Sequence, residues 1–293
     1  IMVKQKKISA FKIIIFTFLT IWSLSLLYLL VWGLFTAVKD PLLDFRKNPL
    51  GFPAQWKFSN FSYVYNNFAI PFVVNGKPVS IGMPEQILNT LLFCVIRSFL
   101  GTFVPCFVGY LVAKYRYKFS SVLYGVALFV MALPIVGAYP AELALLKTLG
   151  VYDTVFGLIL QSSGYLGLYF FVFTASFQVI PNDYYESACL DGASEFVVYF
   201  KIMMPMVFST FATVLLLQFI ANWNDYQYAL LYWPSHPTLS YGLYVISNSP
   251  LQGLNNPPMR LAANVIVIIP ILIVFIIFKD KIMSNISMGG LKE

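Results

Sequence analysis

The sequence predicts an all-α membrane protein with about six transmembrane helices. Of its 293 residues, 59% are hydrophobic and only 11% are charged, whereas soluble domains carry about 25% charged residues. The segment 13–38 contains no charged side chain, and it is longer than the ~20 residues that a helix needs to cross a bilayer. A chain with so few charges cannot cover its surface in water, so its composition favours lipid as the solvent.

The first apolar segment has two interpretations. A cleavable signal peptide would have an apolar core of about 7–15 residues, followed by a cleavage site of small residues. Here the apolar residues continue through 28–32. We therefore favour a retained membrane anchor.

Further apolar segments follow along the chain. They lie at about 88–112, 120–141, 155–179, 207–232 and 261–278. Pro105, Pro134, Pro140 and Pro270 interrupt several of them, which membrane helices tolerate where neighbouring helices satisfy the freed backbone groups. We expect these segments to form one transmembrane domain over residues 1–293.

Basic residues flank the apolar segments on one side of the predicted topology. They are Lys4, Lys6, Lys7 and Lys12 before the first segment, Lys114, Arg116 and Lys118 after the second, and Lys279 and Lys281 after the sixth. Because cytoplasmic loops carry an excess of Lys and Arg, we expect this side and both termini to be cytoplasmic. These residues form no single basic stripe, so the net charge of +7 does not indicate nucleic-acid binding.

The segment 39–87 is predicted to be a sizeable first extracytoplasmic loop. It is rich in aromatic side chains, including Trp56, Tyr63 and Tyr65, with prolines between them. Trp and Tyr favour the half-wet membrane interface, so these rings could line the outer lipid surface. A folded cap that docks an external protein is the alternative, and the sequence leaves both open.

The segment 181–205, between the fourth and fifth apolar segments, predicts a cytoplasmic elbow. Asn182 or Asp183 can cap a short helix over about 183–190. Asp191-Gly192 then ends this helix, since Gly permits a left-handed turn. A second amphipathic helix over about 194–203 is expected to lead into Pro205 and the fifth span. Such a projection fits either a groove on a soluble partner or the membrane surface alone.

The residues of this elbow resemble a known family. Glu186-x-Ala188-x-x-Asp191-Gly192-Ala193 followed by Ile202-x-x-Pro205 is similar to the Glu-Ala-Ala loop of ATP-binding-cassette importer permeases, in particular the carbohydrate subgroup that includes the maltose-transporter permeases. Ser187 and Met204 depart mildly from the pattern. Further stretches extend the resemblance over most of the chain: 88–90, 110–114, 222–225 and 288–292.

The resemblance implies a permease subunit that works by alternating access in the bacterial cytoplasmic (inner) membrane. It implies two cytoplasmic ATPase subunits, a second homologous permease subunit and an extracytoplasmic solute-binding protein. The residues expected to couple the chain to ATP hydrolysis are Glu186, Ser187, Ala188, Asp191, Gly192, Ala193 and Pro205. ATP and Mg²⁺ would be held by the partners, because the chain has no phosphate-binding loop of the Gly-x-x-x-x-Gly-Lys-Ser/Thr type.

Polar residues within the apolar segments are candidates for the substrate path. They are Asn89, Arg97, Gln218, Asn222, Asn224 and Asn264. Arg97 would lie in the outer third of its span, where it could reach the lipid interface or face the path. The Asn residues near 222–224 could equally cap and pack the outer end of the fifth span. A path nearly free of charge favours a sugar or short oligosaccharide as the solute.

Other functional classes are less compatible with the sequence. A secondary transporter would need charged relays within several spans. A membrane enzyme would need His, Asp, Glu or Cys clustered at one depth, and the sequence offers neither a catalytic group nor a metal site. Cys94, Cys106 and Cys189 are expected to be small buried hydrophobic residues. An importer of another solute class remains the main alternative.

Overall fold

The computed structural model describes residues 10–74, 77–115, 117–133, 137–248 and 253–288. The chain divides into two compact units. The first unit combines Ile1–Phe68 with Val245–Ile268, and the second combines Ala69–Tyr244 with Ile269–Glu293. Lys4, Lys6, Lys7, Arg116, Pro134 and the stretch 289–292, which the sequence analysis used, lie outside the described residues.

The first unit is built around a long apolar helix and the folded loop that follows it. Its elements are α1 (Ala10–Ala37), a π-helical turn η1 (Pro41–Phe45), α2 (Ser59–Asn67), and the adjoining parts of α12 (Leu239–Asn248) and α13 (Pro257–Met288). Lys39 is fully buried and donates to the Asn48 carbonyl at 2.7 Å, while Asn60 donates to the carbonyls of Ala37 and Lys39. The loop after α1 is therefore an ordered structure with its own buried polar contacts.

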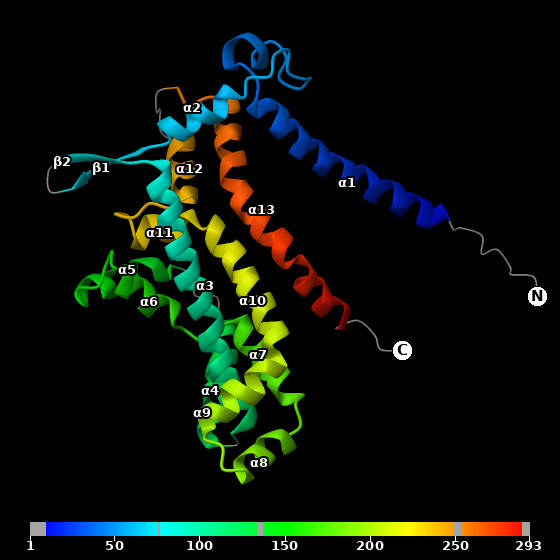
Figure 1. Ribbon diagram of the computed structural model, residues 1–293, viewed down its shortest axis with the longest axis vertical. Helices are drawn as coiled ribbons and strands as arrows, with labels where there is room; N and C mark the ends of the chain where they lie inside the picture. The colour runs from blue at the N-terminus through cyan, green and yellow to red at the C-terminus, as the bar shows by residue number, and fades with distance from the viewer. Residues whose placement is uncertain (1–9, 75–76, 116, 134–136, 249–252, 289–293) are drawn as a thin grey trace, which may run out of the picture. The chain divides into compact units, whose positions relative to one another are not determined.

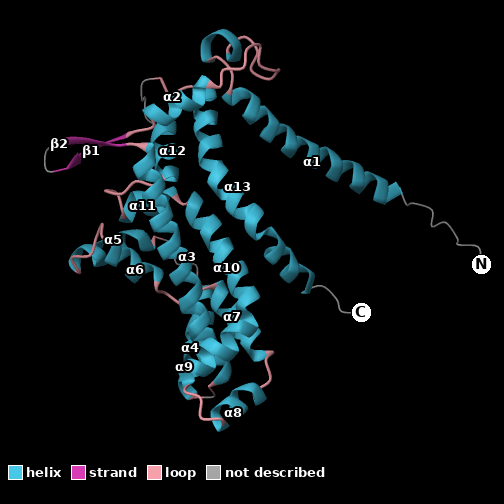
Figure 2. Cartoon of the chain, viewed as in Figure 1, coloured by secondary structure: helices cyan, strands magenta, loops and turns pink. Residues whose placement is uncertain are grey.

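The second unit carries the remaining elements (Figure 1). They are β1 (Ile70–Val74), β2 (Lys77–Ile81), α3 (Met83–Lys114), α4 (Lys118–Ala132), α5 (Ala138–Thr148), α6 (Val155–Ser162), α7 (Leu168–Gln178), α8 (Asp183–Leu190), α9 (Glu195–Val197), the π-helical η2 (Val198–Met203), α10 (Met204–Asn224) and α11 (Tyr226–Tyr232). Figure 2 shows β1 and β2 as an antiparallel hairpin, in which Ile70 pairs with Ile81.

Helix α3 is the central element of the second unit because it packs against both α7 and α10. Gly109 makes the contact with α7 possible: a Cβ at this position would lie 3.0 Å from the backbone nitrogen of Thr174. The aromatic side chains of Tyr110, Phe177 and Tyr199 fill the core beside it.

Pro105 lies inside α3 without ending it. Proline has no N–H, so the carbonyl four residues earlier, that of Gly101, loses its helical partner. The side-chain amide of Gln218 on α10 donates to this carbonyl at 3.3 Å. The proline-containing span is thus continuous, as the sequence predicted, because a neighbouring helix satisfies the freed group.

The all-α membrane fold class is confirmed, but the expected lengths of the spans are partly wrong. Among the described residues, the helices long and apolar enough to cross a bilayer are Ala10–Ala37, Met83–Lys114, Glu195–Asn224 and Pro257–Phe278. The third and fourth predicted spans, 120–141 and 155–179, are instead broken into the shorter helices α4, α5, α6 and α7. Gly137 and Gly167 explain part of this, since both adopt positive φ angles at the starts of α5 and α7.

The boundaries around the fifth span also differ from the expectation. The span predicted over 207–232 ends at Asn224, where Asp225 begins the separate helix α11. The second elbow helix, expected over 194–203, is no separate helix, because Glu195–Asn224 forms one helical stretch. Cys94 and Cys106 are buried as expected, whereas Cys189 is exposed, since α8 buries Ala188 and leaves most other side chains in solvent.

Candidate functional site

The elbow predicted over 181–205 begins with helix α8, which lies at one end of the second unit (Figure 1). Asp183 and Glu186 stand in its first turn, where negative charge is favourable to the helix dipole. Asn182 occupies the cap position, but its side chain does not cap the helix. It instead accepts a hydrogen bond from Lys114 Nζ at 3.1 Å, so it serves a tertiary contact.

The Asp191-Gly192-Ala193 turn has a defined geometry. Gly192 takes a φ of +79°, in the left-handed region. The N–H of Ala193 bonds the carbonyl of Ala188 at 3.0 Å, and the N–H of Gly192 bonds that of Cys189 at 3.1 Å. This pair of bonds is the Schellman ending of a helix, which satisfies carbonyls that would otherwise lack a partner. The predicted helix end is confirmed, with glycine required by the backbone angle.

The side chains of this elbow separate into buried and exposed sets. Ala188 is 6% exposed and packs into the core that also holds Tyr199 and Met203. Glu186, Ser187 and Asp191 are exposed. The exposed face of α8 borders an open groove of about 460 Å³, lined by Pro181, Asp183, Tyr184, Ser187, Ala188, Asp191 and Ile202. The motif therefore holds α8 to the bundle through its alanine and presents its polar groups outward.

A polar tether joins this elbow to the end of α3. Lys114 Nζ donates to the carbonyl of Ile180 at 2.6 Å. The hydroxyls of Tyr115 and Tyr185 both donate to the carboxylate of Glu195, the Tyr185 bond measuring 2.7 Å. Burial and the bond to Glu195 raise the pKa of Tyr185, so its hydroxyl remains a donor at neutral pH. This tether was not predictable from the sequence, because its members are far apart in the chain.

Pro205 lies in the first turn of α10, where a missing N–H is tolerated in a new helix. Here, however, α10 continues from η2, so Pro205 does not start a span as the sequence analysis expected. The π-helical segment Val198–Met203 directly precedes it. A proline inside a continuing helix removes one backbone bond, and wider π-type turns are one way a helix accommodates such a loss.

Arg97, a predicted substrate-path residue, lies on α3 and forms an ion pair. Its Nη1 donates to Asp225 Oδ2 at 2.8 Å, and the two side chains are 18% and 30% exposed. The Tyr228 ring centroid lies 3.5 Å from the guanidinium carbon, and that of Phe93 lies 5.0 Å from it. Asp225 also accepts a hydrogen bond from the backbone N–H of Tyr228 at 2.9 Å. It therefore caps α11 and neutralises the charge of Arg97.

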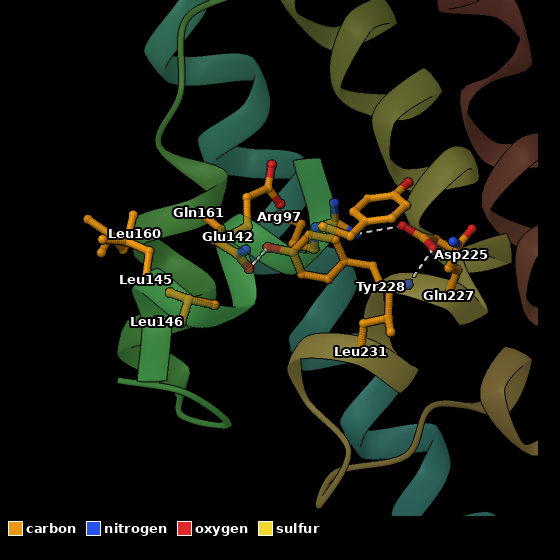
Figure 3. Close-up of a pocket in the computed structure, with 11 residues that line it drawn as sticks. Arg97, Glu142, Leu145, Leu146, Leu160, Gln161, Asp225, Gln227, Tyr228 and Leu231 are labelled. Carbon is orange, nitrogen blue, oxygen red and sulfur yellow. Dashed lines mark hydrogen bonds and ion pairs between the residues drawn. The ribbon is translucent and has the colours of Figure 1, made fainter. Parts of the chain in front are cut away.

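A cavity of about 540 Å³ opens beside this ion pair (Figure 3). It is lined by Arg97, Tyr139, Glu142, Leu145, Leu146, Leu160, Gln161, Asp225, Gln227, Tyr228 and Leu231. Tyr228 donates through its hydroxyl to Gln161, and Tyr232 donates to Glu142 at 2.6 Å. Glu142, Gln161 and Tyr228 were not predicted as site residues. They lie on short helices that only tertiary packing brings close to Arg97.

The other polar candidates make packing contacts. Asn222 is buried and donates to Ser98 Oγ at 3.1 Å, which joins α10 to α3. Gln218 satisfies the Gly101 carbonyl, as described above. Asn89 donates to the Pro237 carbonyl at 3.3 Å. Their amide donors are therefore engaged within the protein.

The two remaining candidates are not among the residues that line the cavity. Asn224 is exposed and donates to the Ile220 carbonyl of its own helix. Asn264 is half-buried on the part of α13 that belongs to the first unit. Of the six predicted residues, the cavity thus includes Arg97.

Comparison with known proteins places this architecture in a family. Residues 101–286 match the model of the binding-protein-dependent transport system inner membrane component. The chain is 24% identical to the diacetylchitobiose uptake system permease protein NgcG of Streptomyces coelicolor, over 92% of this chain and 86% of that protein. It is 25% identical to the arabinooligosaccharides transport system permease protein AraQ of Bacillus subtilis, over 82% and 80%.

A solved structure supports the same fold. A chain from the crystal structure of a bacterial ABC transporter involved in the import of the acidic polysaccharide alginate superposes with a TM-score of 0.73 at 21% identity, covering 94% of this chain and 99% of that chain. The family match spans more than half of the sequence and includes the α8 elbow, α10 and the Asp225 side of the cavity. The chain therefore belongs to the family of inner-membrane components of binding-protein-dependent transport systems.

Proposed function

We propose that this chain is the transmembrane subunit of an ATP-driven importer that takes up a sugar or short oligosaccharide by alternating access. The observation that carries the proposal is the α8 elbow. It is a short helix with a fixed end, anchored by a buried alanine and presenting exposed Glu186, Ser187 and Asp191. A rigid projection of this kind can transmit the motion of a soluble partner to the helices behind it.

Relatives support the solute class. The names of NgcG and AraQ specify diacetylchitobiose and arabinooligosaccharides. The trehalose transport system permease protein SugB of Mycobacterium tuberculosis, 26% identical over 71% of this chain and 77% of that protein, specifies another saccharide. Aromatic faces and a few polar groups in one cavity suit such solutes, because sugar rings present apolar faces and many hydroxyls.

The proposed assembly rests on the family description, and the sequence contains no phosphate-binding loop with which this chain could itself hold ATP. Two cytoplasmic ATPase subunits would bind ATP and Mg²⁺, and each permease would dock one of them through its short helix. A second, homologous permease would complete the pathway. A solute-binding protein would deliver the sugar from outside the bacterial inner membrane, in agreement with the family description.

Within the chain, Glu186 would receive the partner through a charge-assisted hydrogen bond. Gly192 and Asp191 would set the angle at which α8 leaves the bundle. Lys114, Tyr115 and Glu195 would carry the displacement of α8 into α3. If both termini are cytoplasmic, the C-terminal end of α3, which contacts α8, faces the ATPase. The Arg97 cavity then lies toward the opposite side of the membrane.

The direct experiment reconstitutes the complete complex and measures how each solute, with its binding protein, stimulates ATP hydrolysis. Neutral oligosaccharides should stimulate hydrolysis more than acidic sugars, amino acids or phosphate. Glu186→Ala should weaken the complex with the ATPase, whereas Glu85→Ala, which removes an exposed carboxylate near the other end of α3, should not. Stimulation by amino acids alone would contradict the saccharide assignment and leave the importer class standing.

The orientation has a separate test. A cysteine placed at Lys118, at the start of α4, should react with impermeant reagents only from the cytoplasm. In a Cys189→Ser background, which removes the exposed native cysteine of α8, a cysteine at Ser187 should behave in the same way until the ATPase subunit binds and protects it. Labelling of either position from outside would reverse the proposed topology.

A further inference from the structure

The charges that line the Arg97 cavity do not balance. Arg97 is the basic side chain among the lining residues, and Asp225 and Glu142 are the acidic ones. Arg97 is already bonded to Asp225 at 2.8 Å, and the ring of Tyr228 covers its guanidinium group at 3.5 Å. An incoming solute therefore meets Arg97, whose charge is already neutralised by Asp225, and Glu142, whose carboxylate has no basic partner among the lining residues.

We propose that this cavity is a saccharide subsite that accepts neutral and amine-bearing sugars and rejects carboxylate-bearing ones. The inference rests on the proposed function, since it assigns a selectivity to the same pathway. A sugar carboxylate entering the cavity would meet two acidic side chains and would have to displace Asp225 before it could reach Arg97. Like-charge contacts of this kind are a direct means of excluding a wrong ligand.

The remaining lining groups fit a sugar ring. Tyr139 and Tyr228 provide aromatic surfaces, and Leu145 and Leu231 add apolar walls. The carbonyl oxygen of Gln161 is occupied by the Tyr228 hydroxyl, so its amide group supplies donors. A carboxylate has about four acceptor positions, and the bond from Tyr232 uses one on Glu142. Glu142 can thus accept from a sugar hydroxyl or from a protonated amine.

Arg97 consequently has a positioning role. Its ion pair holds Asp225, and Asp225 caps the helix that carries Tyr228. The basic charge in the second span is in this arrangement a structural counter-ion for the cavity wall. This differs from an anion receptor, in which the guanidinium fork would be open to a bidentate carboxylate.

The test measures sugar binding to the purified membrane complex by saturation-transfer NMR, without the external binding protein. The probes are three disaccharides: neutral diacetylchitobiose, cationic chitobiose with free amines, and anionic digalacturonate. We expect signals from the first two and none from the third, with the cationic sugar losing the most signal when salt is raised from low to physiological concentration.

Two variants change the charge of the cavity with little change in shape. Asp225→Asn keeps an oxygen that can cap α11 and releases Arg97, and it should make digalacturonate binding detectable. Glu142→Gln should remove the preference for the cationic disaccharide. Glu85→Gln removes the same charge from an exposed position at the start of α3 and should leave the order of the probes unchanged.

The outcomes separate the subsite from the importer itself. Binding of digalacturonate to the parent complex that Arg97→Gln abolishes would overturn the proposal and make Arg97 an anion receptor. If neutral sugars stimulate transport but give no binding signal, the subsite is wrong and the importer stands. The same holds if Glu142→Gln leaves the preference for the cationic disaccharide unchanged and Asp225→Asn leaves digalacturonate binding undetectable. If no saccharide stimulates ATP hydrolysis with any binding protein, the proposed function fails first.

Discussion

Two regions of α3, on either side of Pro105, are tied to other helices by polar side chains, and they differ in what they leave exposed. Arg97 is paired with Asp225 beside a cavity, and both side chains are largely shielded. At the other region, Lys114 and Tyr115 hold the α8 elbow through Ile180 and Glu195. There the motif residues Glu186 and Ser187 point into solvent.

The difference in exposure indicates which kind of partner each region can bind. A half-buried ion pair fixes the wall of a cavity and suits a small solute, because its charges are already compensated. An exposed set of polar groups on a rigid helix remains accessible from outside the chain and suits a protein partner. Between them, the Pro105 position relies on Gln218 instead of a backbone bond. Three predictions test whether the two regions work as one unit, and a fourth provides a reference outside them.

The largest effect is expected at Gly192, which sets the direction of the elbow. Its φ of +79° costs a non-glycine residue about 1–2 kcal/mol, and a β-branched side chain more. Gly192→Val should reduce ATP-dependent uptake in proteoliposomes to below about a tenth of the parent value, since 1.4 kcal/mol is tenfold in an equilibrium. Gly192→Asn should retain most uptake, because Asn tolerates this conformation. Equal loss in both variants would show that the turn geometry is unimportant.

The second prediction concerns the tether at the α8 end. Glu195→Ala removes the acceptor shared by Tyr115 and Tyr185. Uptake should fall several-fold while ATP hydrolysis by the complex continues, because α8 still docks but no longer moves α3. Uptake by the Glu195→Gln variant, which keeps one acceptor oxygen, should lie between that of Glu195→Ala and that of the parent. A parallel loss of uptake and hydrolysis would indicate a folding defect, so thermal unfolding should be recorded beside both assays.

The third prediction concerns the Pro105 position, which lies between the two regions. Gln218→Leu leaves the Gly101 carbonyl without a donor and should lower stability by about 1–3 kcal/mol. Pro105→Ala restores the helical donor, so Gln218→Leu should cost much less in that background. A double-mutant cycle on thermal unfolding measures this coupling. Additive effects would mean that the two residues do not compensate one another.

The smallest effect is expected in the loop after α1, which takes no part in either region of α3 and serves as a reference. The hydrogen bond from Lys57 lowers the pKa of Asp40 from 3.8 to about 2. A carboxyl group whose pKa is lowered by folding stabilises the folded state at pH values above its pKa in the unfolded chain. This stabilisation is lost as the pH falls toward 2. After correction for the intrinsic pH dependence of amide exchange, the protection factors of residues 40–57 should therefore decrease slightly as the pH falls from about 4 to 2. Asp40→Asn should abolish this change and leave sugar binding unaltered.

Part of the candidate site was predictable because it is local in the sequence. The end of α8 at Gly192 follows from a short-range rule for helix termini, and the structure has the expected left-handed glycine. The ends of the third, fourth and fifth spans were not predictable, since apolar composition is the same in one long helix and in two short ones. Glycines with positive φ and the cap at Asp225 decide where those helices break.

The membrane environment, the class of fold and the elbow were predictable from the sequence, because they depend on composition, on the length of the apolar segments and on local helix-end chemistry. Which polar groups contact one another depends on the tertiary structure. Arg97 and Asp225, Gln218 and Gly101, and Tyr115 and Glu195 are each far apart in the chain, and each pair depends on α3 packing beside α10 or the elbow. A single sequence contains no record of such distances, so it identified Arg97 as a charge within a span but not the acid that neutralises it.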